Sequence, residues 1–149
     1  MGIAHEMLGE KEKANEYFLK GTVGPTEPAA AMYYNDAKPD KIFYAALCYR
    51  KLGQKDKARS LFNKLINYGK QHLFDHVVMD YFAVSLPDLL VWEGNFDELN
   101  RIHCLYMLAL GYYGMGDKEK AMKYLEEVEA MDNNHLGARQ FRTLITASL

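Results

Sequence analysis

A glycine followed five residues later by an alanine occurs three times in this chain, each time in nearly the same surroundings. Residues 9–14 (GEKEKA) recur as residues 53–58 (GQKDKA) and again as residues 116–121 (GDKEKA). A unit that recurs in this way specifies one supersecondary shape used several times. Glycine ends helices where a left-handed backbone is needed, and the alanine opens an apolar spacing typical of a second helix. The repeat therefore predicts an all-α chain of helical hairpins, each turning at its glycine.

Apolar residues on both sides of the second and third glycines follow the spacing of an amphipathic helix. They fall at i, i+3, i+4 and i+7 in four segments: Ile42, Ala45, Ala46 and Tyr49; Ala58, Leu61, Phe62 and Leu65; Leu105, Leu108, Ala109 and Tyr112; Ala121, Tyr124, Leu125 and Val128. Two antiparallel helices approach closely only where a side chain is small. We therefore expect the helices to cross at Ala46, Ala58, Ala109 and Ala121.

This pattern resembles the tetratricopeptide repeat, a helix–turn–helix unit of roughly 34 residues. The small residue at the family's eighth position is matched by Gly2, Ala46 and Ala109, and the tyrosine at its eleventh by Tyr49 and Tyr112. The turn glycine and the following alanine match in all three copies. The resemblance implies a helical-hairpin solenoid that winds as a right-handed superhelix.

The spacing of the copies predicts a single domain over residues 1–149. We interpret this domain as a fragment of a longer protein. A partial first repeat occupies residues 1–20, a second repeat residues 39–71 and a last repeat residues 102–133. The irregular insertion at 72–99 is expected to hold a degenerate helix pair or a long connection. Residues 134–149 carry Leu136, Phe141, Leu144 and Ile145 on one stripe, which predicts a C-terminal capping helix over the last repeat's open face.

A narrower resemblance begins at Asp80. Residues 80–90 (DYFAVSLPDLL), followed by residues 100–104 (NRIHC), are similar to the C-terminal repeat region of large bacterial proteins with an N-terminal domain of unknown function. Bacteroides-type bacteria are a frequent source of these proteins. By association alone, this resemblance implies an accessory module of a larger carbohydrate-active protein.

Charge and composition exclude several classes of function. The chain has 149 residues and a formal net charge of −2, so no global field favours nucleic acid. It holds no apolar run of the roughly 20 residues needed to cross a bilayer. Its two cysteines, Cys48 and Cys104, lie in apolar helical runs, which predicts buried thiols in a reducing, cytoplasmic compartment. We expect a non-enzymatic protein without a cofactor.

In the tetratricopeptide family, the first helix of each pair lines the concave face. The groove positions carried onto this sequence are Asp40, Phe43, Leu47, Arg50 and Lys51 in one repeat, and His103, Tyr106, Leu110 and Tyr113 in the other, where Gly114 follows. The resemblance implies a scaffold that binds a protein or peptide, or another domain of the parent chain, through this wall. The groove is either open or covered by the chain's own segment around Trp92, within residues 72–99.

Several residue pairs suggest chemistry but have simpler interpretations. His72 and His76, at i and i+4, could hold zinc only with a further ligand, and we predict no metal site. His103 and Cys104 are adjacent on a helix and so do not face each other, which argues against a nucleophile pair. Trp92, with Phe82 and Phe96, either stacks on a sugar ring or forms a small core under a long connection.

The first repeat offers a last candidate surface. A helix cut in half at residues 1–8 would leave apolar side chains such as Phe18 uncovered. This predicts a possible homodimer through the exposed first repeat.

Overall fold

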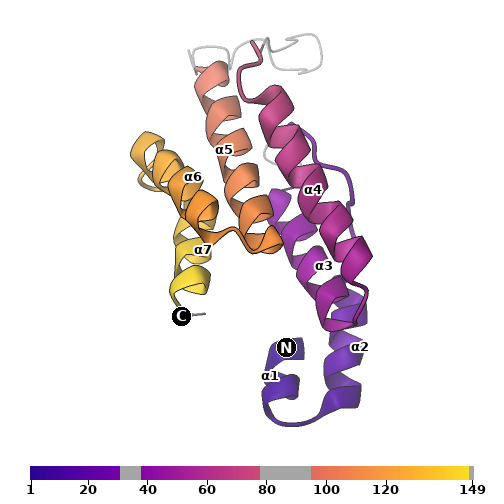
Figure 1. Cartoon of the computed structure of the whole chain (residues 1–149). Helices are drawn as coiled ribbons and strands as arrows, with labels where there is room; N and C mark the ends of the chain where they lie inside the picture. Colours follow the sequence, from indigo (N-terminus) through magenta and orange to yellow (C-terminus); the bar gives the residue numbers. More distant parts are fainter. Residues whose placement is uncertain (31–37, 78–94, 148–149) are drawn as a thin grey trace, which may run out of the picture.

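The computed structural model describes residues 1–30, 38–77 and 95–147. Within these ranges it contains seven helices and no strand, which confirms the all-α prediction. The helices are α1 (Gly2–Met7), α2 (Lys11–Gly21), α3 (Pro39–Lys51), α4 (Lys55–His72), α5 (Phe96–Met115), α6 (Lys118–Met131) and α7 (Leu136–Ala147). Each packs against the next along the chain, so the hairpins follow one another in a row (Figure 1).

The three repeated glycines form the turns of three hairpins. Gly9, Gly53 and Gly116 have φ angles of +77°, +78° and +90°, the left-handed region that side chains disfavour. A Cβ added to any of them would meet no atom within 4 Å. The glycines are therefore required by backbone conformation and not by space, as the sequence predicts.

The four small residues predicted at the helix crossings are all buried, as the prediction requires. Ala46, Ala109 and Ala121 are 0% exposed, and Ala58 is 2% exposed. Larger side chains surround them in one continuous core, which includes Phe62, Leu65, Leu105 and Leu125. Burying these side chains supplies the main driving force for stacking the hairpins.

Glycines that the repeat pattern does not include bring α4 and α5 into direct contact. A Cβ on Gly69 would lie 2.8 Å from the carbonyl oxygen of Cys104. A Cβ on Gly111 would lie 2.6 Å from Cγ1 of Ile66 and 3.0 Å from the carbonyl oxygen of Phe62. No side chain fits at either point, so the second and last repeats stack directly on each other.

The prediction for residues 72–99, a degenerate helix pair or a long connection, concerns a segment that the structure describes only in part. Helix α4 ends at His72, and residues 73–77 are not helical. Residues 78–94 lie outside the described residues, so this expectation stays a prediction. The new helix begins at Phe96, where the side chain of Asn95 caps it by accepting from the Glu98 N–H at 3.2 Å.

The first hairpin also differs from expectation. Gly2 lies against the ring of Phe18, so close that a Cβ would come within 2.6 Å of its Cε1 atom. Phe18 is therefore only 6% exposed, and the prediction that it is uncovered is wrong. Even a short α1 buries this ring because its glycine lets the two helices approach. The exposed apolar residues of the hairpin are instead Ile3, Met7, Leu8 and Leu19.

Among the described helices, none combines the length and the apolar character that crossing a membrane would require.

The α4–α5 contact predicts the effect of a single methyl group. Replacing Gly111→Ala pushes a side chain against Ile66 and the Phe62 backbone, and overpacking of this kind costs about 1–3 kcal/mol. Because the Cβ meets backbone atoms that cannot move aside cheaply, the upper part of that range, about 2–3 kcal/mol, applies. Alanine has a higher helix propensity than glycine, which offsets roughly 1 kcal/mol of this cost. We therefore expect a net loss of about 1–2 kcal/mol in the free energy of unfolding, measured by urea denaturation.

The control is Asn67→Ala, a change on the exposed side of α4. It should alter the free energy of unfolding by no more than about 0.5 kcal/mol. A Gly111→Ala chain as stable as the wild type would show that the two helices are not in close contact.

Cys104 reports on the same interface. Burial, and after it the negative charge of Asp75, raises the pKa of its thiol to about 11. Since the thiolate is the reactive form, this shift alone lowers the reactive fraction at pH 8 by roughly 100-fold relative to the unfolded chain. In a Cys48→Ser background, iodoacetamide should therefore modify folded Cys104 at least that much more slowly than Cys104 in urea.

The shift also sets a pH dependence of stability. Because folding raises this pKa, the stabilising contribution is complete below pH 9 and is lost as pH rises towards 11.

Equal alkylation rates of Cys104 in the folded and unfolded chain would mean that the α4–α5 interface does not shield the thiol.

Candidate partner-binding face

Helices α3 and α5 share the face on which the sequence places the groove residues. The hydroxyl of Tyr106 donates to Oδ1 of Asp40 at 2.5 Å. The ring centroids of Phe43 and Tyr113 lie 6.2 Å apart. Each pair joins one helix to the other, so the structure brings residues of both predicted sets together.

One residue of α7 fills the middle of this face. The ring of Phe141 lies 5.5 Å from Phe43, 6.3 Å from Tyr106 and 5.3 Å from Tyr113, at interplanar angles of 81°, 80° and 87°. These near-perpendicular arrangements place ring edges against ring faces, the favoured geometry for aromatic pairs. We call Phe43, Tyr106 and Tyr113 the aromatic seat.

The cover changes what the predicted groove residues can contact. Phe43 is 0%, Leu110 1%, Tyr106 2% and His103 9% exposed, whereas Asp40, Leu47 and Tyr113 are partly buried, and Arg50 and Lys51 are exposed. An open groove along the whole face is therefore not what the structure contains. The described segment that covers the seat is α7, which the sequence assigned to the last repeat's end. Residues 78–94, including Trp92, lie outside the described part.

The two basic groove residues have partners within the chain. The guanidinium of Arg50 lies 4.9 Å from the ring centroid of Phe62, and its Nη2 donates to the carbonyl oxygen of Gly114. Nζ of Lys51 lies 2.6 Å from Oε2 of Glu6. Arg50 thus links the second repeat to the last, and Lys51 links it to the first hairpin.

An open hollow remains at one end of the same face. It lies between the start of α3, the middle of α5 and the start of α7, and its volume is about 450 Å³. We call it the α3–α7 groove. Its lining residues are Lys38, Pro39, Asp40, Lys41, Tyr44, His103, Tyr106, His135, Leu136, Gly137 and Gln140. Three of the predicted residues, Asp40, His103 and Tyr106, contribute to its wall.

The groove combines an accessible aromatic ring with polar groups. Tyr44 is 46% exposed, and its ring packs edge-on against Phe43 at 5.3 Å. Burial, and then the charge of Asp40, raises the pKa of the Tyr44 phenol, so the hydroxyl stays protonated. Burial and the same carboxylate also raise the pKa of Tyr106. Lys41 and Leu136 are exposed at the rim.

Sequence reasoning missed Tyr44, His135 and Gln140. Tyr44 follows directly after a groove position, and the family pattern gives no role to that place. A tyrosine standing on the polar flank of an amphipathic helix was the available signal. His135 and Gln140 join the site only because α7 folds back onto the face, which no local spacing reveals.

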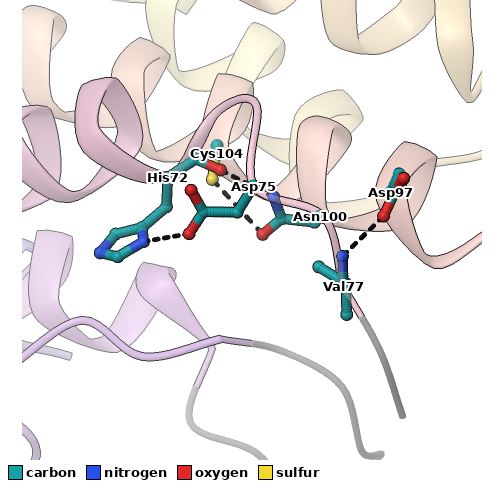
Figure 2. A network of polar contacts seen from close by, with 6 residues as sticks. All are labelled: His72, Asp75, Val77, Asp97, Asn100 and Cys104. Atoms are coloured by element: carbon teal, nitrogen blue, oxygen red, sulfur yellow. Dashed lines mark hydrogen bonds and ion pairs between the residues drawn. The ribbon is translucent and has the colours of Figure 1, made fainter.

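The two histidines considered for zinc contact separate carboxylates. Nδ1 of His72 lies 2.6 Å from Oδ2 of Asp75 (Figure 2), and Nδ1 of His76 lies 2.8 Å from Oδ2 of Asp97. Oδ1 of Asp97 also accepts from the Val77 N–H at 2.7 Å. In the described ranges, no three histidine, cysteine or acidic residues gather as metal ligands. These contacts fasten residues 73–77 to the first turn of α5.

His103 and Cys104 point to different neighbours. Nε2 of His103 lies 2.8 Å from the carbonyl oxygen of Ala29, whereas the thiol of Cys104 donates to Oδ1 of Asn100 at 3.7 Å (Figure 2). Divergence of adjacent helical residues is the expected geometry. The arrangement has no nucleophile and base in contact at this place.

The sugar-stacking hypothesis concerns Trp92 and Phe82, which lie outside the described residues. Phe96, the third aromatic residue of that group, is partly buried at the start of α5. The narrower bacterial resemblance over residues 80–90 is untested as well. Both stay predictions.

Two segments match known family models. Residues 42–68 match one model described as tetratricopeptide repeat, and residues 102–135 match another with the same description. These segments cover most of the α3–α4 hairpin and the α5–α6 hairpin with the turn into α7. No solved structure matches the chain. The chain therefore holds two segments similar to tetratricopeptide repeats within an all-α helical-repeat fold.

Proposed function

We propose that this protein is a non-catalytic scaffold that holds a protein or peptide segment on the concave face, in the α3–α7 groove. Tetratricopeptide repeats generally mediate protein–protein interactions, and the two matches to such repeats support this class of function. The observation that supports this particular location is the half-exposed Tyr44 ring at the wall of a hollow of about 450 Å³.

The chemistry of the groove suits an extended peptide with one apolar anchor. Tyrosine rings are frequent energetic centres of protein interfaces because they bury large area at little entropic cost. The partner's apolar side chain would pack between Tyr44 and Leu136. Lys41 and Gln140 would meet polar or acidic groups at the rim.

Rigidity supports the same proposal. Asp40 is held by the hydroxyl of Tyr106, and Tyr106 is in turn packed against Phe141. Walls of this kind lose little conformational freedom when a ligand binds, so more of the contact energy appears as affinity. The walls of the groove that α3 and α5 supply therefore stand on fixed helices and not on a loop.

The test begins with a library of random displayed peptides, from which those that bind the immobilised wild-type chain are selected. Replacing Tyr44→Ala should weaken the selected peptides at least about 10-fold, because it removes the central ring. The matched control is Phe74→Ala, which deletes another exposed aromatic ring away from the groove. Dissociation constants follow from fluorescence polarisation, and circular dichroism checks that both variants are folded.

Peptides that bind the folded Tyr44→Ala chain as tightly as the wild type would contradict the proposed location. Equal losses in Tyr44→Ala and Phe74→Ala would contradict it too, because the binding would then follow general surface apolarity.

A second copy of the chain is a further candidate partner, at the first hairpin. Ile3 and Met7 lie at i and i+4 on one side of α1 and are 57% and 83% exposed. Apolar side chains grouped in this way mark association surfaces when they form a patch. Lysine at both positions should shift sedimentation equilibrium from dimer to monomer. A wild-type chain that stays monomeric at the highest attainable concentration would contradict self-association.

A further inference from the structure

The way α7 lies on the concave face resembles a bound ligand more than a structural partner. Its buried side chains are Ala138, Phe141 and Ile145, at i, i+3 and i+7. This is the anchor spacing of an amphipathic helix that docks into a groove. Between these anchors, Arg139, Gln140 and Thr143 are exposed.

Apart from Gly137, where a Cβ would lie 2.8 Å from the Tyr106 hydroxyl, α7 meets the face through its side chains. Phe141 reaches the aromatic seat through ring edges and faces, with centroid distances of 5.3–6.3 Å. At the α4–α5 interface, by contrast, Gly69 lies so near the backbone of Cys104 that no Cβ fits. Helix α7 is instead anchored by three buried side chains, which is how a helix docked in a groove is held.

A polar contact fixes the orientation of α7. Arg142 donates from Nε and Nη2 to both carboxylate oxygens of Glu129 on α6, at 2.8 Å and 2.6 Å. The glutamate, followed by neighbouring Glu126, keeps the pKa of Arg142 raised. Because this arginine–carboxylate pair is bidentate, a helix that docks in the same way needs a basic residue next to its aromatic anchor.

The connection to α7 is a short turn with its own bonds. Asn133 and Asn134 are exposed, and the turn is closed by bonds from the Asn134 and His135 N–H groups to Asp132. His135 Nδ1 accepts from the Ala138 N–H at 3.0 Å and so caps α7 itself. Because these bonds are local, α7 is held on the face by its buried anchors, by the Arg142–Glu129 pair and by the His135 ring against Tyr106.

We propose that the aromatic seat with Glu129 is a helix-binding site, occupied in the isolated chain by α7. Its partner is an amphipathic helix that presents a small residue, an aromatic residue three positions later with a basic residue next to it, and an aliphatic residue four positions after the aromatic one. Such a helix takes the place of α7. This inference rests on the proposed function, because it uses the same concave face.

The two sites are coupled through α7. Its first turn supplies Leu136, Gly137 and Gln140 to the wall of the α3–α7 groove. A helix that displaces α7 removes that wall, so groove peptides and the helical partner oppose each other's binding by the same factor.

The test uses a fluorescein-labelled peptide of residues 133–149, added to the full-length chain. In the wild-type chain, attached α7 competes at an effective concentration on the order of 1 mM, so the peptide binds weakly. The Phe141→Ala chain, whose own helix lacks the anchor, should bind the wild-type peptide at least about 10-fold more tightly. The Thr143→Ala chain, altered on the exposed side of α7, should behave like the wild type.

A charge exchange separates specific docking from general adhesion. The peptide carrying Arg142→Glu should bind the Phe141→Ala chain poorly and recover its binding on the Phe141→Ala, Glu129→Arg chain. Should Phe141→Ala fail to fold, the Arg142→Ala chain, which leaves the aromatic seat intact, replaces it in both titrations.

Absence of saturable peptide binding to the folded variant, or binding that ignores the charge exchange, would overturn the inference. The selected groove peptides, measured on the wild-type chain, keep the two proposals apart. Their loss in Tyr44→Ala supports the groove even where the helix peptide does not bind.

Discussion

The structure depends on the close approach of α4 and α5. Three glycines, Gly69, Gly111 and Gly114, face the opposite helix where any side chain would collide. This approach places the last repeat directly on the second.

The concave face follows from this stacking. With α5 held against α4, it also lies beside α3, and the bond from Tyr106 to Asp40 joins the two first helices. The bulky rings on that face form an apolar area that would be exposed to water if no helix covered it. Phe141 of α7 covers part of this area, and the part that stays open is bordered by Tyr44. One helix thus closes one binding surface and shapes another.

The hairpins could be predicted because their determinants are local. Gly53 and Gly116 need a left-handed backbone, and Ala46 and Ala109 need small volume, so both leave a mark at fixed spacing. The groove positions could be carried over because they depend on the same register. The resting place of α7 could not: an apolar stripe with Phe141 shows that a helix will dock, without showing on which surface.

Hydrogen exchange of individual amides tests the central claim most directly. If the glycine contact holds the repeats together, the facing stretches of α4 and α5 around Gly69 and Gly111 should share the slowest rates, because they open only with the whole fold. The short α1 and the ring-held α7 should exchange faster. Exchange in α4 and α5 as fast as in α1 would contradict the account.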